Sequence, residues 1–189
     1  MKSADISRDL RLYGMQVFRP NDISRMTGKG KGYVYLLLHK SKAFVRVENG
    51  LYCLPGTDPL VVASNVSIPS YVSLITTFVY YKLIDQVAST IKVITTKRHR
   101  MMRFQGTDIE FKTLRRAYMY GYGSANGIAM ASPEKAVVDA LYLNEDVKYA
   151  EEALSNGLEN GTISIKKLLE YAEKTGTKSI AKTIARLAK

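Results

Sequence analysis

The sequence predicts an α+β protein in two parts, residues 1–56 and residues 57–189. Three observations carry this prediction. The first part has three short segments of helical periodicity, followed by a segment in which polar and apolar residues alternate. The second part places β-branched, strand-like segments between helical ones, and the chain ends in three amphipathic helical segments. The second part is therefore expected to be a mixed α/β domain with a small sheet and terminal helices.

The first two helices are predicted from residue spacing and end signals. The segment SADISRDLRLY places Ile6, Leu10 and Tyr13 at helical intervals on one side, and Gly14 ends it. The segment NDISRMTG predicts a second, shorter helix that stops at Gly28.

The stretch TGKGKGYVYLLLHK alternates glycine and lysine before an apolar run. A phosphate-binding P-loop would need a Gly-Lys-Ser/Thr ending, but Lys31 is followed by Gly32. A dinucleotide-binding fingerprint would need a third glycine where Tyr33 stands. We therefore predict a turn that lets the backbone approach a partner closely, followed by a third helix over residues 31–40.

The segment AFVRVENGLYCLP, residues 43–55, predicts a β-hairpin. Apolar and polar residues alternate around Asn49-Gly50, which is the sequence signal of a type I′ turn. Three helices followed by a hairpin within 56 residues is the element order of a winged helix-turn-helix domain. In such a domain the third helix enters the major groove of DNA, and the hairpin is the wing.

The charge balance favours a polyanionic partner. The chain has 28 lysines and arginines against 17 acidic residues, a net charge of +11. Residues 1–56 hold ten of the basic and four of the acidic side chains, so the cationic charge is densest there. A basic surface without such a partner is the alternative.

The residues expected to contact DNA lie on the third helix, on the turn before it and on the hairpin. On a helical wheel, Val34, Leu37 and Leu38 face the first two helices, and the opposite side faces outward. Basic side chains suit phosphates, and the other outward side chains suit phosphates or base edges. The predicted DNA contacts are Thr27, Lys29, Lys31, Tyr33, Tyr35, Leu36, His39, Lys40, Arg46 and Asn49. In the alternative, Leu36 and the two tyrosines pack inside the protein and the hairpin only stiffens the fold.

In the second part, LVVASNV predicts a short apolar helix, and residues 70–83 predict a longer one with a serine cap. Strands are predicted over residues 91–95 and 109–112, with a third in GIAMAS after the Asn126-Gly127 turn. The segment SPEKAVVDALYL predicts a further helix, because it begins with a serine cap followed by proline.

A basic segment, KRHRMMR, follows the first predicted strand of the second part. Its clustered cations repel one another unless an anion is present. The segment could be a second DNA contact, a docking site for a toxin or an RNA, or a solvated loop. The cations considered for a second nucleic-acid or partner contact are Lys97, Arg98, Arg100 and Arg103.

Several other classes of protein are disfavoured. No carboxylate pair, nucleophile with a base, or metal-ligand cluster is found in the sequence, so we expect no enzymatic activity, no cofactor and no metal site. The single cysteine, Cys53, lies in an apolar run and is expected to be buried. No apolar run approaches the roughly 20 residues that a bilayer requires, and no signal peptide is recognised, so we expect a cytoplasmic protein.

Four segments in order, RVENGLYCLP, PSYVSLITTFVYYKLI, VITTKRHRMMRFQGTDIEF and IAMASPEKAVVDALYL, resemble the AbiEi family of transcriptional regulators, the antitoxins of type IV toxin–antitoxin systems. The resemblance implies a winged-helix domain that binds double-stranded operator DNA, typically inverted repeats, and represses its own operon. It implies that residues 31–40 are the DNA-facing helix and residues 43–55 the wing. It also implies a C-terminal domain, marked by SPEKAVVD, that opposes a nucleotidyltransferase-like toxin directly or functionally. The alternative is an RNA-binding adaptor, or a subunit of a nucleic-acid-modifying enzyme, that uses the basic C-terminal face.

Overall fold

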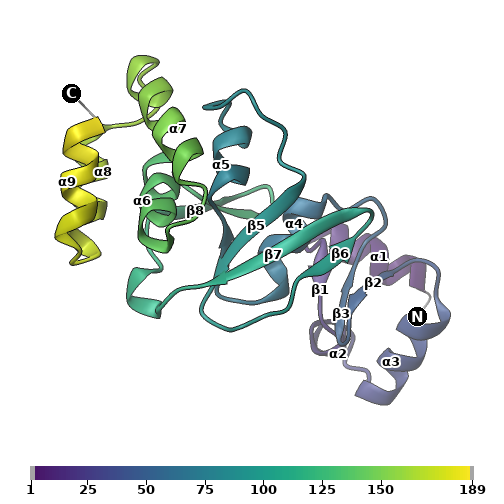
Figure 1. Cartoon of the computed structure of the whole chain (residues 1–189). Coiled ribbons are helices and arrows are strands. Elements are labelled where there is room, and N and C mark those ends of the chain that lie inside the picture. The colour runs from purple at the N-terminus through teal and green to yellow at the C-terminus, as the bar shows by residue number, and fades with distance from the viewer. Residues whose placement is uncertain (1–2, 188–189) are drawn as a thin grey trace.

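A computed structural model describes residues 3–187 of the chain (Figure 1). Within this range the protein has a mixed α+β fold with nine α-helices and two β-sheets. The helices are α1 (Ser3–Leu12), α2 (Pro20–Thr27), α3 (Lys31–Lys40), α4 (Pro59–Val66), α5 (Ile75–Tyr80), α6 (Pro133–Leu143), α7 (Val147–Glu159), α8 (Ile165–Lys174) and α9 (Lys178–Leu187), with a short 3-10 helix η1 (Arg116–Tyr118). The strands are β1 (Val17–Phe18), β2 (Val45–Glu48), β3 (Leu51–Cys53), β4 (Ser70–Val72), β5 (Thr90–Thr95), β6 (Met102–Phe104), β7 (Thr107–Thr113), β8 (Tyr122–Ala125) and β9 (Ile128–Ala131).

The N-terminal core lies between the first three helices and the small sheet, whose strand order is β1-β3-β2 with antiparallel pairing. The three predicted helices are confirmed, and α3 has the expected bounds. Tyr13 does not join the core, because α1 ends at Leu12 and the Tyr13 side chain is 74% exposed. The predicted apolar stripe is therefore wrong at its last position. The buried residues of this core are Ile6, Leu10, Phe18, Ile23, Val34, Leu38, Phe44, Tyr52 and Leu54.

The predicted hairpin is confirmed, but its turn is not the one expected. β2 and β3 pair antiparallel with Glu48 opposite Leu51, so Asn49 and Gly50 form a two-residue loop. A type I′ turn needs positive φ at both loop residues; Gly50 has it, at 72°, whereas Asn49 does not. The strand pairing shifts by one residue between Arg46 and Glu48, and this irregularity lets the loop close with a different turn.

Strand β3 connects the N-terminal core to the rest of the protein through its two faces. Successive residues of a strand point to opposite sides, so Tyr52 packs in the N-terminal core whereas Leu51 and Cys53 pack in a second core. That second core contains Val62 of α4 and residues of the larger sheet. The guanidinium of Arg19 adds a hydrogen bond to the backbone oxygen of Val66, at 3.0 Å. The N-terminal helices and the larger sheet are therefore joined by packed side chains as well as by the chain itself.

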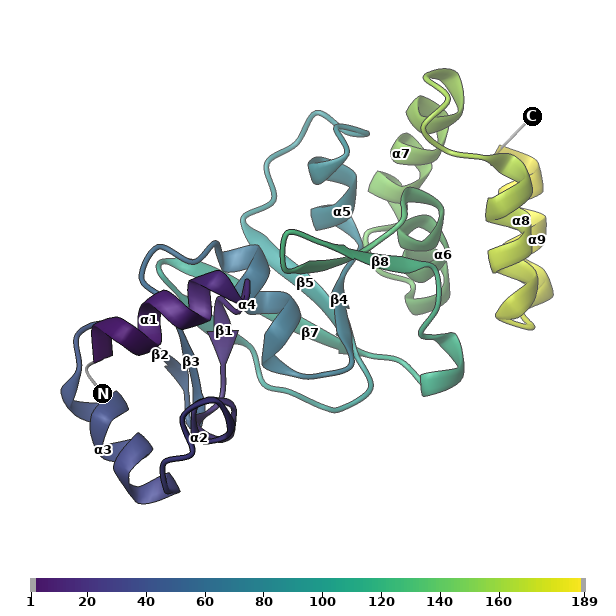
Figure 2. The same ribbon diagram turned by 180° about the vertical axis from the view of Figure 1, so that it is seen from behind.

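The larger sheet has six strands in the order β6-β7-β5-β4-β9-β8. β5 pairs parallel with β7 and β4 pairs parallel with β9, while the other neighbours pair antiparallel. Tyr71, Ile94 and Ala131 pack in the core that includes residues of α5 to α9, whereas Val72 and Val93 pack in the core that includes α4. In Figure 2, α6 to α9 lie to the right of the sheet and α4 lies on its other side, toward the N-terminal helices. Both faces of the sheet are thus covered.

Residues 70–83 do not form the single helix that the sequence predicts. They form β4 and then, after Leu74 with a φ of 59°, the short helix α5. All three residues of β4 are buried because it is a central strand covered on both faces, so its one serine, Ser70, marks no solvent-facing side. The predicted strands of the second part correspond to β5, β7 and β9, and the predicted helices at its start and after GIAMAS to α4 and α6. The edge strands β6 and β8 have no counterpart in the sequence prediction.

Candidate nucleic-acid interface

The turn between α2 and α3 is held in one conformation by its own hydrogen bonds. Gly28 has a φ of 67° and its N–H donates to the backbone oxygen of Ser24, which ends α2. The hydroxyl of Ser24 donates to the backbone oxygen of Lys29 at 2.6 Å, and the N–H of Lys29 donates to the hydroxyl of Thr27 at 3.3 Å. Thr27 therefore orders the turn, while the Lys29 side chain stays exposed.

Helix α3 buries one side and exposes the other, as the helical wheel predicts. Val34 and Leu38 are buried in the N-terminal core. Tyr33, Tyr35 and Leu36 are exposed by 44%, 48% and 53%, so the alternative in which they pack inside the protein is wrong for this structure. The remaining predicted contacts of this segment, Lys31, His39 and Lys40, are also exposed. Within the part of the chain that the structure describes, residues after the hairpin leave this outward side exposed.

The hairpin presents Arg46 and Asn49 at its surface. The guanidinium of Arg46 donates to the side-chain oxygen of Asn49 at 3.3 Å and to the backbone oxygen of Glu48 at 3.4 Å. Both predicted contacts of the hairpin are thus exposed and lie against each other. This arrangement orients a guanidinium beside an amide at the hairpin tip.

The basic segment of the second part, residues 97–103, lies against the hairpin in the folded protein. Nε2 of His99 lies 3.2 Å from Oε2 of Glu48, and the His99 ring packs 4.3 Å from the ring of Phe111, measured between centroids. Figure 1 shows β6, which includes the last two residues of the segment, beside β2 of the hairpin. A groove of about 580 Å³ lies between them, lined by Arg46, Val47, Glu48, Asn49, Arg100, Met101, Met102 and Arg103. Two sets of contacts predicted from distant parts of the sequence therefore form one surface, which we call the hairpin groove.

Most cations of this surface have no acidic partner. Among the residues described by the structure, the side chains of Arg46 and Arg100 are within ion-pair distance of no carboxylate. Arg103 lies 3.6 Å from Asp108 and also donates to the backbone oxygen of Gly106. The lysines of α3 and its preceding turn, Lys29, Lys31 and Lys40, likewise form no ion pair within the described part. The exposed cations Lys97 and Arg98 do not line the groove. Of the four cations predicted for a second contact, only Arg100 and Arg103 therefore belong to this surface.

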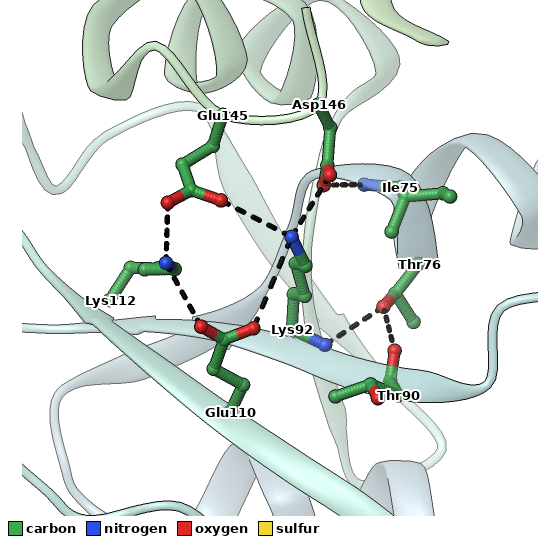
Figure 3. Close-up of polar contacts among 8 residues, drawn as sticks. All are labelled: Ile75, Thr76, Thr90, Lys92, Glu110, Lys112, Glu145 and Asp146. Atoms are coloured by element: carbon green, nitrogen blue, oxygen red, sulfur yellow. Dashed lines mark hydrogen bonds and ion pairs between the residues drawn. The ribbon is translucent and has the colours of Figure 1, made fainter.

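A second charged cluster, on the larger sheet, consists of Lys92, Glu110, Lys112, Glu145 and Asp146 (Figure 3). Nζ of Lys92 lies 2.9 Å from Asp146 and 3.3 Å from Glu145, and Lys112 bridges Glu145 and Glu110. Burial opposes the charge of Lys92, but hydrogen bonds and attraction from Asp146 and Glu145 outweigh it and raise the pKa of Lys92. Because the charges satisfy one another, this cluster fixes the connection between α6 and α7 on the sheet and offers no open ligand position.

The buried pair Lys135–Asp139 of α6 is not among the site residues predicted from the sequence. The Lys135 ammonium contacts the Asp139 carboxylate, and both side chains are 1% exposed. Asp139 also accepts hydrogen bonds from the hydroxyls of Tyr71, at 3.0 Å, and Ser73, at 2.9 Å. Burial raises the pKa of Asp139, and these three donors oppose that effect. The i,i+4 spacing of the pair is a sequence signal, but only the packing of α6 on β4 shows that it is buried.

Within the described residues, no group of three or more histidine, cysteine or acidic side chains is placed to hold a metal ion. In the same part of the chain, every helix is too short or too polar to span a bilayer. No protein-family model and no curated protein matches the sequence.

Proposed function

We propose that the protein is a sequence-specific DNA-binding transcriptional regulator whose residues 1–56 act as a winged helix-turn-helix domain. The observation that carries the proposal is the hairpin groove, where Arg46, Asn49, Arg100 and Arg103 converge from segments about fifty residues apart. Arg46 and Arg100 have no carboxylate partner within the described residues, and cations brought together in this way are stabilised by a polyanion that neutralises them. The exposed outward side of α3, just before this hairpin in the chain, supplies the element that would read base edges.

In this proposal each element contacts a different part of the duplex. α3 lies in the major groove, with Lys29 and Lys31 on phosphates at its start and Leu36 positioned for a thymine methyl group. The hairpin places Arg46 on the backbone or in the minor groove. Arg100 extends the phosphate contacts beyond the N-terminal domain. Every phosphate contact would add roughly 0.9 to the slope of log affinity against log salt.

The resemblance to the AbiEi regulators extends the proposal to the biological role. The protein would bind an operator with inverted repeats, repress its own operon and oppose a nucleotidyltransferase-like toxin. The segment SPEKAVVD, residues 132–139, is the part of the C-terminal domain that supports this extension. A toxicity assay in which the neighbouring gene is expressed with and without this protein tests the antitoxin role separately from DNA binding.

The test of DNA binding is fluorescence anisotropy with a duplex from the upstream region of the gene and a scrambled duplex of equal length. We expect much tighter binding to the upstream duplex at physiological salt. Equal affinity for the two duplexes would overturn the proposal, and tighter binding to single-stranded RNA of the same sequence would favour the RNA-binding adaptor instead.

Two double variants test the placement of the contacts. Lys29→Ala with Lys31→Ala, and Arg46→Ala with Arg100→Ala, should each weaken binding to both duplexes and flatten the salt dependence, by about 0.9 for each phosphate that the variant no longer neutralises. The matched control is Lys182→Ala, which removes an exposed cation of α9 at the other end of the protein. A salt slope that is unchanged in the double variants, or reduced equally in the control, would contradict the proposed surface.

A further inference from the structure

Strand β8 forms one edge of the six-stranded sheet, with β9 on one side and no strand on the other within the described residues (Figure 2). All four of its residues are exposed. The two-residue Asn126-Gly127 turn makes Ala125 and Ile128 the first hydrogen-bonded pair, and pairs then alternate along the ladder. The bond from the N–H of Ser132 to the oxygen of Gly121, at 2.8 Å, agrees with that alternation. The peptide groups of Tyr122 and Ser124 therefore point to the open side.

This edge lacks the charged side chains, the proline and the bulge that often prevent strand pairing between molecules. Exposed edges are normally protected by charged side chains, proline or a bulge. Residues 117–133 contain no charged residue, although the chain carries 45 lysine, arginine, aspartate and glutamate side chains. β8 itself pairs with β9 in regular register. The opposite edge of the sheet, β6, carries Arg103 and begins two residues after Arg100. The two edges of the sheet thus differ in kind.

Gly123, in the middle of β8, is not required by the fold of a single chain. Its φ is not positive, and a Cβ atom built on it would meet no atom within 4 Å. A glycine inside a strand weakens the strand, and its usual reason is a bend, a bulge or the close approach of another backbone. β8 has no bulge and pairs with β9 in unbroken register, so we take the close approach of another backbone as the reason for this glycine.

We propose that β8 pairs antiparallel with β8 of a second copy of this chain. The open peptide groups select the register: Tyr122 lies opposite Ser124 of the partner subunit, and Ser124 lies opposite Tyr122 of the partner subunit. The two-fold axis then passes between Gly123 and the partner's Gly123. That central pair is not hydrogen-bonded, so its Cα atoms approach to about 4.5 Å, the closest spacing in an antiparallel sheet. Glycine is the residue that permits this approach without side-chain contact.

The charge of the protein favours a second copy at this edge over any other face. Two molecules of net charge +11 repel each other, and the uncharged segment around β8 brings no like charges together. The exposed rings of Tyr80 and Tyr81 border β8 and can enlarge the buried area. Even so, a four-residue strand pair buries less than the roughly 1,200 Å² of a stable interface. The dimer is therefore weak and depends on concentration.

Sedimentation velocity over a series from nanomolar to high micromolar protein, without DNA, tests the proposal. We expect the wild type to shift from monomer toward dimer as concentration rises. Gly123→Lys places two ammonium groups together at the axis and should keep the protein monomeric at every concentration. Its Cβ enters open space, so the variant should retain the wild-type circular dichroism spectrum and unfolding midpoint. Val87→Lys, which adds the same charge at a side chain that is 90% exposed, should dimerise almost as the wild type does.

Hydrogen exchange supplies a second readout that assigns the register. The amides of Tyr122 and Ser124 should exchange more slowly as concentration rises, whereas the amide of Gly123, already bonded to Met130, should not change. A wild type that stays monomeric, a dimer that survives Gly123→Lys, or a dimer that Val87→Lys disrupts equally would each overturn the proposal. Because no DNA is present, a protein that does not dimerise would contradict only this proposal and not the proposed function. A protein that dimerises but binds both duplexes equally would contradict only the proposed function.

Discussion

The imidazole of His99 and the carboxylate of Glu48 connect the larger sheet to the hairpin, with 3.2 Å between Nε2 and Oε2. The other ring nitrogen, Nδ1, lies 2.7 Å from the backbone oxygen of Arg100. Both ring nitrogens thus face acceptor oxygens, one on the hairpin and one in the basic segment. The pair fixes the hairpin groove, because it holds Arg100 and Arg46 on the same side of the structure.

We expect His99→Ala to loosen the hairpin. The variant lacks the imidazole that bridges to Glu48 and packs against Phe111, so amides of residues 46–50 should exchange faster in hydrogen-exchange mass spectrometry. The decrease in unfolding free energy should be about 1 kcal/mol, as for one hydrogen bond at a half-buried position. The control is His39→Ala, which alters an exposed histidine of α3 and should leave hairpin exchange unchanged. Unchanged exchange in His99→Ala would contradict the bridging role.

We expect Lys135→Met to destabilise the protein severely. The change leaves the Asp139 carboxylate buried without its counter-charge, which costs about 3–5 kcal/mol. Urea unfolding measures this difference. The double variant Lys135→Met with Asp139→Leu removes both charges and should recover a large part of the loss. If the double variant were less stable than the single one, the buried pair would have a role other than mutual neutralisation.

We expect the stability contributed by Glu145 to disappear in acid. A hydrogen bond from Lys112, followed by that from Lys92, lowers the pKa of Glu145 against the opposing effect of burial. A carboxyl with a lowered pKa stabilises the folded state above the ordinary glutamate pKa of about 4.3. This contribution is lost as the pH falls through the lower value of the folded protein. The unfolding free energies of wild type and Glu145→Gln should therefore differ near neutral pH and converge on acidification.

The control for this pH dependence is Glu152→Gln, because Glu152 is exposed and forms no ion pair within the described residues. Its unfolding free energy should follow that of the wild type at every pH. A difference between wild type and Glu145→Gln that stayed constant down to strongly acidic pH would show that the carboxylate charge is not what stabilises the cluster.

We expect the thiol of Cys53 to be unreactive in the folded protein. Its side chain is fully buried in the core between the hairpin and α4, and burial raises the pKa of the Cys53 thiol against a weaker opposing hydrogen bond with Thr57. A thiol-specific chromogenic reagent should react only after denaturant unfolds the chain. Fast reaction without denaturant would mean that β3 separates from α4 in the native state.

Local sequence patterns predict a helix or strand when its end signals and its apolar spacing lie within the segment itself. α3 follows from a glycine-rich turn and an apolar stripe, and α6 follows from Ser132 and Pro133, whose cap is present in the structure. The same patterns fail for β4, because a strand buried on both faces shows no alternation of polarity. They fail again for β8, because three of its four residues, Gly123, Ser124 and Ala125, are small and carry no strand signal. From the sequence alone, Lys135 would be placed on the surface of α6, because lysine is usually exposed. Only the packing of the helix on β4 shows that it is buried.

The sequence by itself determines the mixed α+β class, the excess of positive charge and the outward residues of α3, because these depend on composition and on spacing within one element. Only the tertiary structure decides that Arg46 and Asn49 meet Arg100 and Arg103 in one groove. That meeting depends on the order of strands in the sheet and on β3 packing on both its faces. Contacts between segments fifty residues apart are fixed by the packing of the whole fold, and no local pattern encodes them.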